Sequence, residues 1–145
     1  MSELANDVRN EIVDLHRFFV GWFNGTLRPQ ELDSFIAPRL DDQTFYVTPD
    51  GNRLERDDLI GMLRQTHGSN PAFRIEVRDV RIRRDYGDYV LATYTEWQKG
   101  ARASAQSENA RMTTVLLAKT QPIKWLHIHE TWLPEAVRAA GSFDF

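Results

Sequence analysis

Hydrophobic residues recur at every third or fourth position in the first part of the chain and at every second position in its second half. The first spacing predicts an amphipathic helix over residues 4–24, because side chains three and four apart share one face of a helix. The same reasoning, with Pro29 in a first turn and Gly68 as a C-terminal cap, predicts two shorter helices over residues 29–38 and 55–68. We therefore expect three helices in the N-terminal half.

Alternating hydrophobic and polar residues predict a short strand followed by four long ones. The short strand is Thr44–Thr48, closed by the turn Pro49-Asp50-Gly51. The long strands cover residues 73–82, 89–98, 111–119 and 123–132. The alternation slips by one residue near Asp79, which predicts a β-bulge that bends the sheet. Helices first and strands afterwards favour an α+β fold, in which helices pack on one face of a strongly curved antiparallel sheet and leave a conical cavity.

Composition and charge narrow the class of protein. With 145 residues and 41% hydrophobic composition, the chain fits one domain over residues 1–145. The formal net charge of -3, and the acids between the arginines of residues 74–84, argue against a nucleic-acid partner. The absence of cysteine excludes disulfides and thiolate chemistry. No stretch approaches the roughly 20 apolar residues of a membrane span and the N-terminus lacks an apolar core, so we expect no membrane partner and a cytoplasmic location.

The last strand, Ile123–Trp132, concentrates the candidate chemistry. Side chains of a strand alternate between its two faces, so one face carries Trp125, His127, His129 and Thr131. The other face carries Leu126, Ile128, Glu130 and Trp132. We expect this second, more aliphatic face to point into the cavity.

Glu130 would then lie inside the cavity as a candidate catalytic residue. Loss of solvent raises the pKa of a carboxyl group toward the range of a general acid or base, unless a cation holds the group ionised. The alternative is a strand-end glutamate that lies in solvent or pairs with an arginine for structure. Trp132, on the same face, either stacks on a ligand or caps the core.

His127 and His129 could both ligate a metal, because residues two apart on a strand point the same way. A metal site requires at least a third ligand, and the remaining histidines, His16 and His67, have no spacing that forces them close. We therefore expect no metal and no other cofactor. An outer face rich in aromatic and imidazole rings favours packing between two copies of the chain, which predicts a homodimer formed through the sheet.

His16 lies beside the apolar stripe of the first helix and could reach the cavity as a second catalytic candidate. A histidine there is more often a helix-flank residue with a satisfied hydrogen bond. Aromatic residues on the strands surround the expected cavity, and they suit a flat apolar ligand or simply fill the core. These aromatic residues are Phe45, Tyr46, Tyr94 and Trp97.

The order of elements, the phrase Val47-Thr48-Pro49-Asp50-Gly51 and the final Trp125-x-x-x-His129 strand together resemble the nuclear-transport-factor-2-like (NTF2-like) superfamily. The resemblance runs from about Val8 to Pro134 and is closest to the SnoaL-like and DUF4440-type small proteins. Ketosteroid isomerases and the association domain of calmodulin-dependent kinase II share this superfamily. The resemblance implies a cone-shaped, cystatin-like fold, and the fold alone hosts many functions.

Residue by residue, the resemblance implies that the catalytic residues of one relative are missing and that an anion-binding residue of another is present. In ketosteroid isomerases a tyrosine donates a hydrogen bond to the developing oxyanion and an aspartate moves the proton, and these positions correspond here to Phe19 and Thr48. A phenyl ring cannot donate and a threonine hydroxyl is not a base near pH 7. Steroid-type isomerisation is therefore disfavoured, and Phe19 becomes a wall of the cavity. The run Gln106–Arg111 is similar to the segment of the kinase association domain whose arginine faces a carboxylate-binding pocket, which makes Arg111 a candidate anion anchor.

Two hypotheses of different classes remain. In the first, the chain holds a small molecule in a cavity lined by Phe19, Tyr46, Trp97, Arg111 and Trp132, and Glu130 transfers a proton in an isomerase, dehydratase or cyclase type of reaction. In the second, the chain is a non-catalytic module for ligand sensing or for assembly of identical copies.

Overall fold

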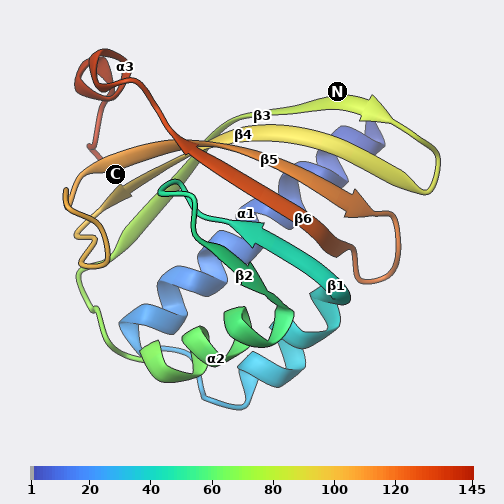
Figure 1. Cartoon of the computed structure of the whole chain (residues 1–145), viewed down its shortest axis with the longest axis horizontal. Helices are drawn as coiled ribbons and strands as arrows, with labels where there is room; N and C mark the ends of the chain where they lie inside the picture. The colour runs from blue at the N-terminus through green and yellow to red at the C-terminus, as the bar shows by residue number, and fades with distance from the viewer. Residues whose placement is uncertain (1) are drawn as a thin grey trace.

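The computed structural model describes residues 2–145 as a layer of helices inside a curved sheet (Figure 1). The helices are α1 (Glu3–Asn24), η1 (Leu32–Ile36), η2 (Ala37–Arg39), α2 (Arg56–Thr66) and α3 (Glu135–Ala140). The strands are β1 (Leu40–Val47), β2 (Arg53–Glu55), β3 (Arg74–Asp85), β4 (Tyr89–Lys99), β5 (Asn109–Ala118) and β6 (Lys124–Trp132). They form one six-stranded sheet in the order β2-β1-β6-β5-β4-β3. The predicted α+β fold is thereby confirmed.

Helix α1 has clear sequence signals at both ends and one buried face. The Ser2 hydroxyl accepts a hydrogen bond from the Ala5 N–H at 3.1 Å, and Gly25 ends the helix with a φ of 81°. Its inner face buries apolar side chains against the concave side of the sheet, where they form the core. These side chains are Val8, Ile12, Leu15, Phe18 and Trp22.

The predicted second helix is a short irregular segment. Leu32–Ile36 forms a π-helical turn and Ala37–Arg39 a single 3₁₀ turn. Pro38 has no N–H to donate and clashes with a continuing α-helix, so the chain leaves the helical conformation here and enters β1.

The sheet has one more strand than expected and is not wholly antiparallel. The segment Arg53–Glu55 folds back on β1 after the turn at Gly51, so that α2 begins only at Arg56. Strand β1 runs parallel to β6, with Leu40 beside Trp125. The expectation of a purely antiparallel sheet is wrong at this pair, because β1 enters from η2 at the same end of the sheet at which β6 begins.

Several register shifts interrupt the pairing of the strands, and two of them bear on the predictions. The predicted bulge in β3 is confirmed by a register shift between Arg78 and Arg81, where Asp79 has a φ of 57°. A second shift lies in β6, where Leu117 pairs with Trp125 and Leu116 with His127, so that Leu126 is an extra residue. None of the helices between residues 2 and 145 is long and apolar enough to cross a lipid bilayer.

Candidate functional site

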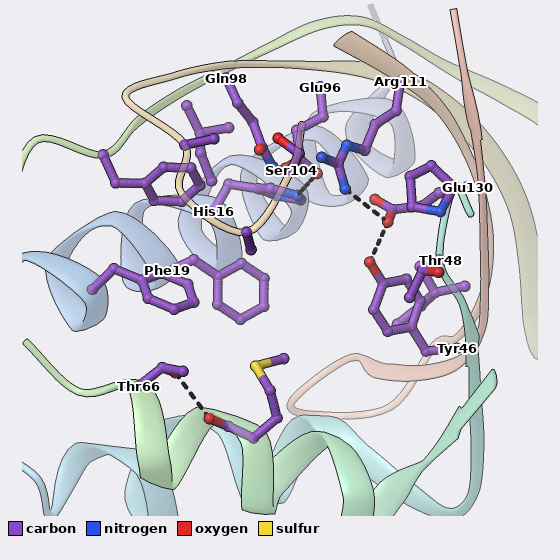
Figure 2. Close-up of a pocket in the computed structure, with 18 of the residues that line it drawn as sticks. His16, Phe19, Tyr46, Thr48, Thr66, Glu96, Gln98, Ser104, Arg111 and Glu130 are labelled. Carbon is purple, nitrogen blue, oxygen red and sulfur yellow. Dashed lines mark hydrogen bonds and ion pairs between the residues drawn. The ribbon is translucent and has the colours of Figure 1, made fainter. Parts of the chain in front are cut away.

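A cavity of about 640 Å³ lies between helices α1 and α2 and the concave face of the sheet. Most of its walls are apolar side chains from both helices and from strands β3 and β6. The loop between β4 and β5 adds Ala101–Ser104, and Ser104 lies near the polar end of the cavity in Figure 2. A space of this size and character is typical of small-molecule sites. The apolar walls include Leu15, Phe19, Phe23, Met62, Leu63, Phe73, Ile75 and Ile128.

Glu130 lies at the polar end of this cavity and is only 6% exposed. The Tyr46 hydroxyl donates a short hydrogen bond to its Oε1, and Arg111 Nη1 donates to the same oxygen at 3.3 Å (Figure 2). The Thr113 hydroxyl donates to Oε2 at 3.4 Å. Three strands, β1, β5 and β6, thus hold one carboxyl group in place.

Burial and the nearby carboxylate of Glu96 raise the pKa of Glu130 to about 7, although Arg111 and the Tyr46 hydroxyl act in the opposite direction. Burial and the charge of Glu130 also raise the pKa of the Tyr46 phenol well above its usual range, so this hydroxyl keeps its proton near neutral pH. A carboxyl group with a pKa near 7 can both give and take a proton under physiological conditions. Glu130 therefore has the properties of a general acid or base.

Glu96 is a second buried carboxylate in the cavity and was not among the residues predicted from the sequence. His16 Nε2 lies 3.0 Å from its Oε1, and the Gln98 amide donates to its Oε2. Burial alone would raise the pKa of Glu96, but the neighbouring His16 and Arg111 overcome burial and lower it to about 2. Glu96 is therefore ionised wherever the protein is folded near neutral pH.

His16 is held on α1 with both ring nitrogens in contact with acceptors. Its Nδ1 lies 2.7 Å from the Ile12 carbonyl oxygen and its Nε2 faces Glu96. Burial alone would lower the pKa of His16, but the Glu96 carboxylate raises it above the usual value. Both ring nitrogens therefore face acceptors, an arrangement that the doubly protonated, positively charged ring satisfies. The satisfied hydrogen bond of the alternative is present, and Glu96 adds a charged partner to it.

Arg111 connects the two carboxylates. It stands directly opposite Glu96 in the β4–β5 ladder, and it contacts Glu130 on the neighbouring strand. Its guanidinium also donates to Asn109 Oδ1 at 3.0 Å and lies 4.8 Å from the centre of the Trp132 ring. Among residues 2–145, no group accepts a hydrogen bond from its Nε. The guanidinium therefore keeps one unused donor.

The structure brings most of the predicted residues together at the cavity and excludes Trp97. Six of the predicted residues line the cavity, namely His16, Phe19, Tyr46, Arg111, Glu130 and Trp132. Trp97 instead lies on the outer face of β4, where its ring contacts Phe143 at a centroid distance of 5.5 Å. The prediction for Trp97 is wrong because Tyr94 points inward, and a residue three positions along a strand points to the opposite side.

Two further expectations about facing are corrected in strands β1 and β6. Trp125 was expected outside, but it is 1% exposed and belongs to the core. The extra residue at Leu126 shifts the alternation by one, which turns Trp125 inward while Ile128 and Glu130 keep their inward direction. Phe45 was expected beside the cavity, but it stacks on His127 on the outer face at 5.8 Å.

His127 and His129 share the outer face of β6, with ring centroids 5.9 Å apart. Within residues 2–145, no group of three or more histidine, aspartate or glutamate side chains is arranged to hold a metal ion. Because both rings lie on the outer face, the sheet separates them from the cavity.

A signal for Glu96 and Gln98 was present in the sequence. Val90, Ala92 and Tyr94 point inward on β4, and the same alternation continues to Glu96 and Gln98. Following the inward face of this strand past its last apolar residue identifies both.

Comparison with known proteins gives a family and a fold. The model of the family described as "Sucrose-6-phosphate phosphohydrolase C-terminal" matches residues 8–134. Sucrose-phosphatase 1 from Nicotiana tabacum is 28% identical over an alignment of 143 positions, and the match covers 93% of this chain and 33% of that protein. The chain therefore spans about a third of the length of the curated relative it matches.

Solved structures agree on the architecture. An NTF2-like protein of unknown function from Pseudomonas aeruginosa has a TM-score of 0.78 and 28% identity, over 88% of this chain and 99% of that one. The CaMKII hub from S. rosetta has a TM-score of 0.70 and 12% identity, over 92% of this chain and 99% of that one. The predicted NTF2-like fold is confirmed by these structures.

Proposed function

This chain belongs to the sucrose-6-phosphate phosphohydrolase C-terminal family and has an NTF2-like fold, and from that premise we propose that it binds a small, mainly apolar molecule in its cavity and transfers a proton to or from it. The observation that carries this proposal is Glu130, a buried carboxyl group with a pKa of about 7 at the polar end of an apolar cavity. Pairs of carboxyl groups whose surroundings drive their pKa values apart are typical of acid–base sites.

The neighbours of Glu130 suggest how the chemistry proceeds. When Glu130 is ionised, it can take a proton from a carbon next to a carbonyl group of the ligand. The negative charge then develops on the carbonyl oxygen, where the Tyr46 hydroxyl and the Arg111 guanidinium are available as donors. Return of the proton to a different atom of the ligand completes an isomerisation, and loss of a leaving group completes an elimination.

Binding is tested first by blocking the cavity. Met62 lines the cavity, whereas Met112 stands opposite Thr131 on the outer face of the sheet. Met62→Trp should remove binding of a fluorescent apolar probe such as 2-naphthoate, while the matched Met112→Trp should leave it unchanged. Native mass spectrometry of the purified protein then reports whether a ligand is retained. Equal probe affinity in both variants would contradict binding in this cavity.

Proton transfer is tested with 2-tetralone, an apolar bicyclic ketone whose α-hydrogens exchange with solvent. In D₂O, NMR should show faster exchange with the wild-type protein than with Glu130→Gln, because the amide of glutamine is not a base near neutral pH. At pH 5, where Glu130 carries its proton, the variant should melt within a few degrees of the wild type, since the two neutral side chains have the same shape. Equal exchange rates for wild type, variant and buffer would remove Glu130 from this role.

A second candidate function is assembly of identical copies through the outer face of the sheet. Helices α1 and α2 lie on the concave side of the sheet and leave the opposite face of β5 and β6 without a helix (Figure 1). This face carries partly buried side chains, among them Phe45, Met112 and Leu116. Apolar side chains in such a position favour contact with another copy. Analytical ultracentrifugation should give a homodimer that Leu116→Lys dissociates, while Tyr86→Lys, at an exposed hairpin tip, leaves it intact. A wild-type monomer at high concentration would contradict this assembly.

A further inference from the structure

The charged groups at the end of the cavity alternate in sign along a buried row. His16 faces Glu96, Glu96 stands opposite Arg111, and Arg111 contacts Glu130. All four residues are at least nine-tenths buried, with exposed fractions between 5% and 8%. Charges this far from water must be compensated by one another or by a ligand.

The sum of these charges depends on one proton. With Glu130 ionised, two positive and two negative groups cancel. With Glu130 protonated, one positive charge is left over, next to an Arg111 Nε that has no acceptor among residues 2–145. An anion that enters beside an ionised Glu130 therefore leaves a net negative charge in a dry site, whereas an anion that enters together with a proton leaves the site neutral.

The contacts decide which carboxylate takes the proton. Glu96 is held ionised by the imidazolium of His16 at 3.0 Å and by the Gln98 amide. Glu130 has weaker support, a 3.3 Å contact to Arg111 and a 3.4 Å contact to Thr113, and its Tyr46 partner can also donate to a ligand oxygen. Several titratable groups surround Glu130 on the elements packed against it. They are His16 from α1, Tyr46 from β1, Tyr94 and Glu96 from β4, and Arg111 from β5.

We infer that the cavity takes an organic acid carrying a single negative charge together with one proton, which Glu130 accepts, and that the His16–Glu96 ion pair is the positioning element that reserves this proton for Glu130. The inference rests on the proposed function, since it names the ligand class and the pH control of that same cavity. For a bound acid it makes Glu130 the group that first donates a proton, after which the ionised Glu130 can take one back. The apolar walls suit a hydrocarbon body for the acid. A sugar phosphate, with a charge near -2 at pH 7, would exceed the one positive charge that the site can free.

Calorimetry with two probes of the same shape tests the inference. One is 2-naphthoate, an anion, and the other is 2-naphthamide, its neutral analogue. Titrations in two buffers with different ionisation enthalpies measure the number of protons taken up on binding. With a free-state pKa of about 7, 2-naphthoate should take up about 0.9 proton at pH 8 and about 0.1 at pH 6. The Kd of 2-naphthoate should be about tenfold higher at pH 8 than at pH 6, because only the fraction of the protein in which Glu130 is protonated binds the anion.

Variants of the buried carboxyl groups test which of them takes up the proton on binding. Glu130→Gln should bind 2-naphthoate without proton uptake and with a Kd that does not change between pH 6 and 8. The matched variant Glu11→Gln removes another buried carboxyl group, which contacts Arg39 and Trp125, and should keep the uptake. Glu96→Gln should shift the midpoint of uptake to lower pH, because it removes the negative charge that disfavours ionisation of Glu130. A merely structural role of Glu96 would leave this midpoint unchanged.

The outcomes separate the inference from the proposed function. Binding of 2-naphthamide but not 2-naphthoate, or binding of 2-naphthoate without proton uptake at pH 8, would overturn the inference and leave a ligand-binding cavity. Tighter binding of sucrose 6-phosphate than of 2-naphthoate would overturn the single-charge, apolar class. Binding of no probe by the wild-type protein would overturn both the inference and the proposed function.

Discussion

Replacing Glu130 by glutamine should change the pH dependence of stability in a way that only a buried, protonated carboxyl group explains. The ordinary pKa of a glutamate is 4.5, and in the folded protein that of Glu130 is about 7. Between these two values the folded state holds a proton that the unfolded state has released. Stability therefore falls as pH rises through this window, and the contribution of Glu130 is fully present below pH 4.5 and lost above about pH 7.

The size of the effect follows from the shift. A difference of one pKa unit corresponds to about 1.4 kcal/mol, so the whole shift of Glu130 from 4.5 to about 7 amounts to about 3.5 kcal/mol. Glu96 adds nothing over this range, because its pKa of about 2 lies below it. The Glu96 carboxylate raises the pKa of His16, but the contribution of His16 is present in both proteins and cancels in their difference to first order. The glutamine variant has no such group.

Urea unfolding at pH 5 and at pH 8 measures this difference. The free energy of unfolding of Glu130→Gln minus that of the wild type should increase by about 2.5 kcal/mol between pH 5 and pH 8, because only the wild type loses the contribution of Glu130. Glu108→Gln serves as the control, because Glu108 is exposed in the loop between β4 and β5 and meets solvent in both states. The same relative stability of Glu130→Gln at both pH values would show that Glu130 is ionised in the folded protein at pH 5, and would refute the reasoning.

Three further outcomes are expected. Tyr46→Phe removes the hydrogen bond that favours the ionised form of Glu130, so the midpoint of Glu130 titration, read by ¹³C NMR, should rise by about one unit; a fall would contradict the assigned donor. Gly141→Ala places a methyl group 2.2 Å from the Trp97 ring and should lower Tm by several degrees, whereas Gly61→Ala, with open space on helix α2, should raise it slightly. Adding a chelator should leave Tm unchanged, and a large drop would revive a metal role for the outward histidines of β6.

The sequence predicts the class of fold and the direction of Glu130 because both depend on local periodicity. The spacing of hydrophobic residues indicates the long first helix and the four long strands without tertiary information. Glu130 follows from Ile128, two residues before it, since no irregularity separates them. The short strand β2 escapes prediction because three residues are too few to establish an alternation.

Bulges limit how far such periodicity can be followed. The bulge in β3 is visible because apolar residues stand on both sides of it, so the slip of one position can be counted. The bulge at Leu126 is hidden, because Trp125, Leu126 and His127 are each acceptable on either face. The facing of Trp125 is therefore predicted wrongly because the hydrophobicity of these three residues does not distinguish the buried face of the strand from the exposed one.

The row of charges could not be predicted because it depends on register between strands. Glu96 and Arg111 stand opposite each other only because the β4–β5 connection has its observed length and path. That connection consists mostly of small and polar residues and lacks a short hairpin turn that would fix the pairing of the two strands. The sequence therefore allows several registers. A shift of two residues would keep every side chain on its own face and still bring Arg111 opposite Tyr94 or Gln98. The pKa of Glu130 is thus a property of the assembled sheet, and the acid–base character of the site cannot be read from residue types alone.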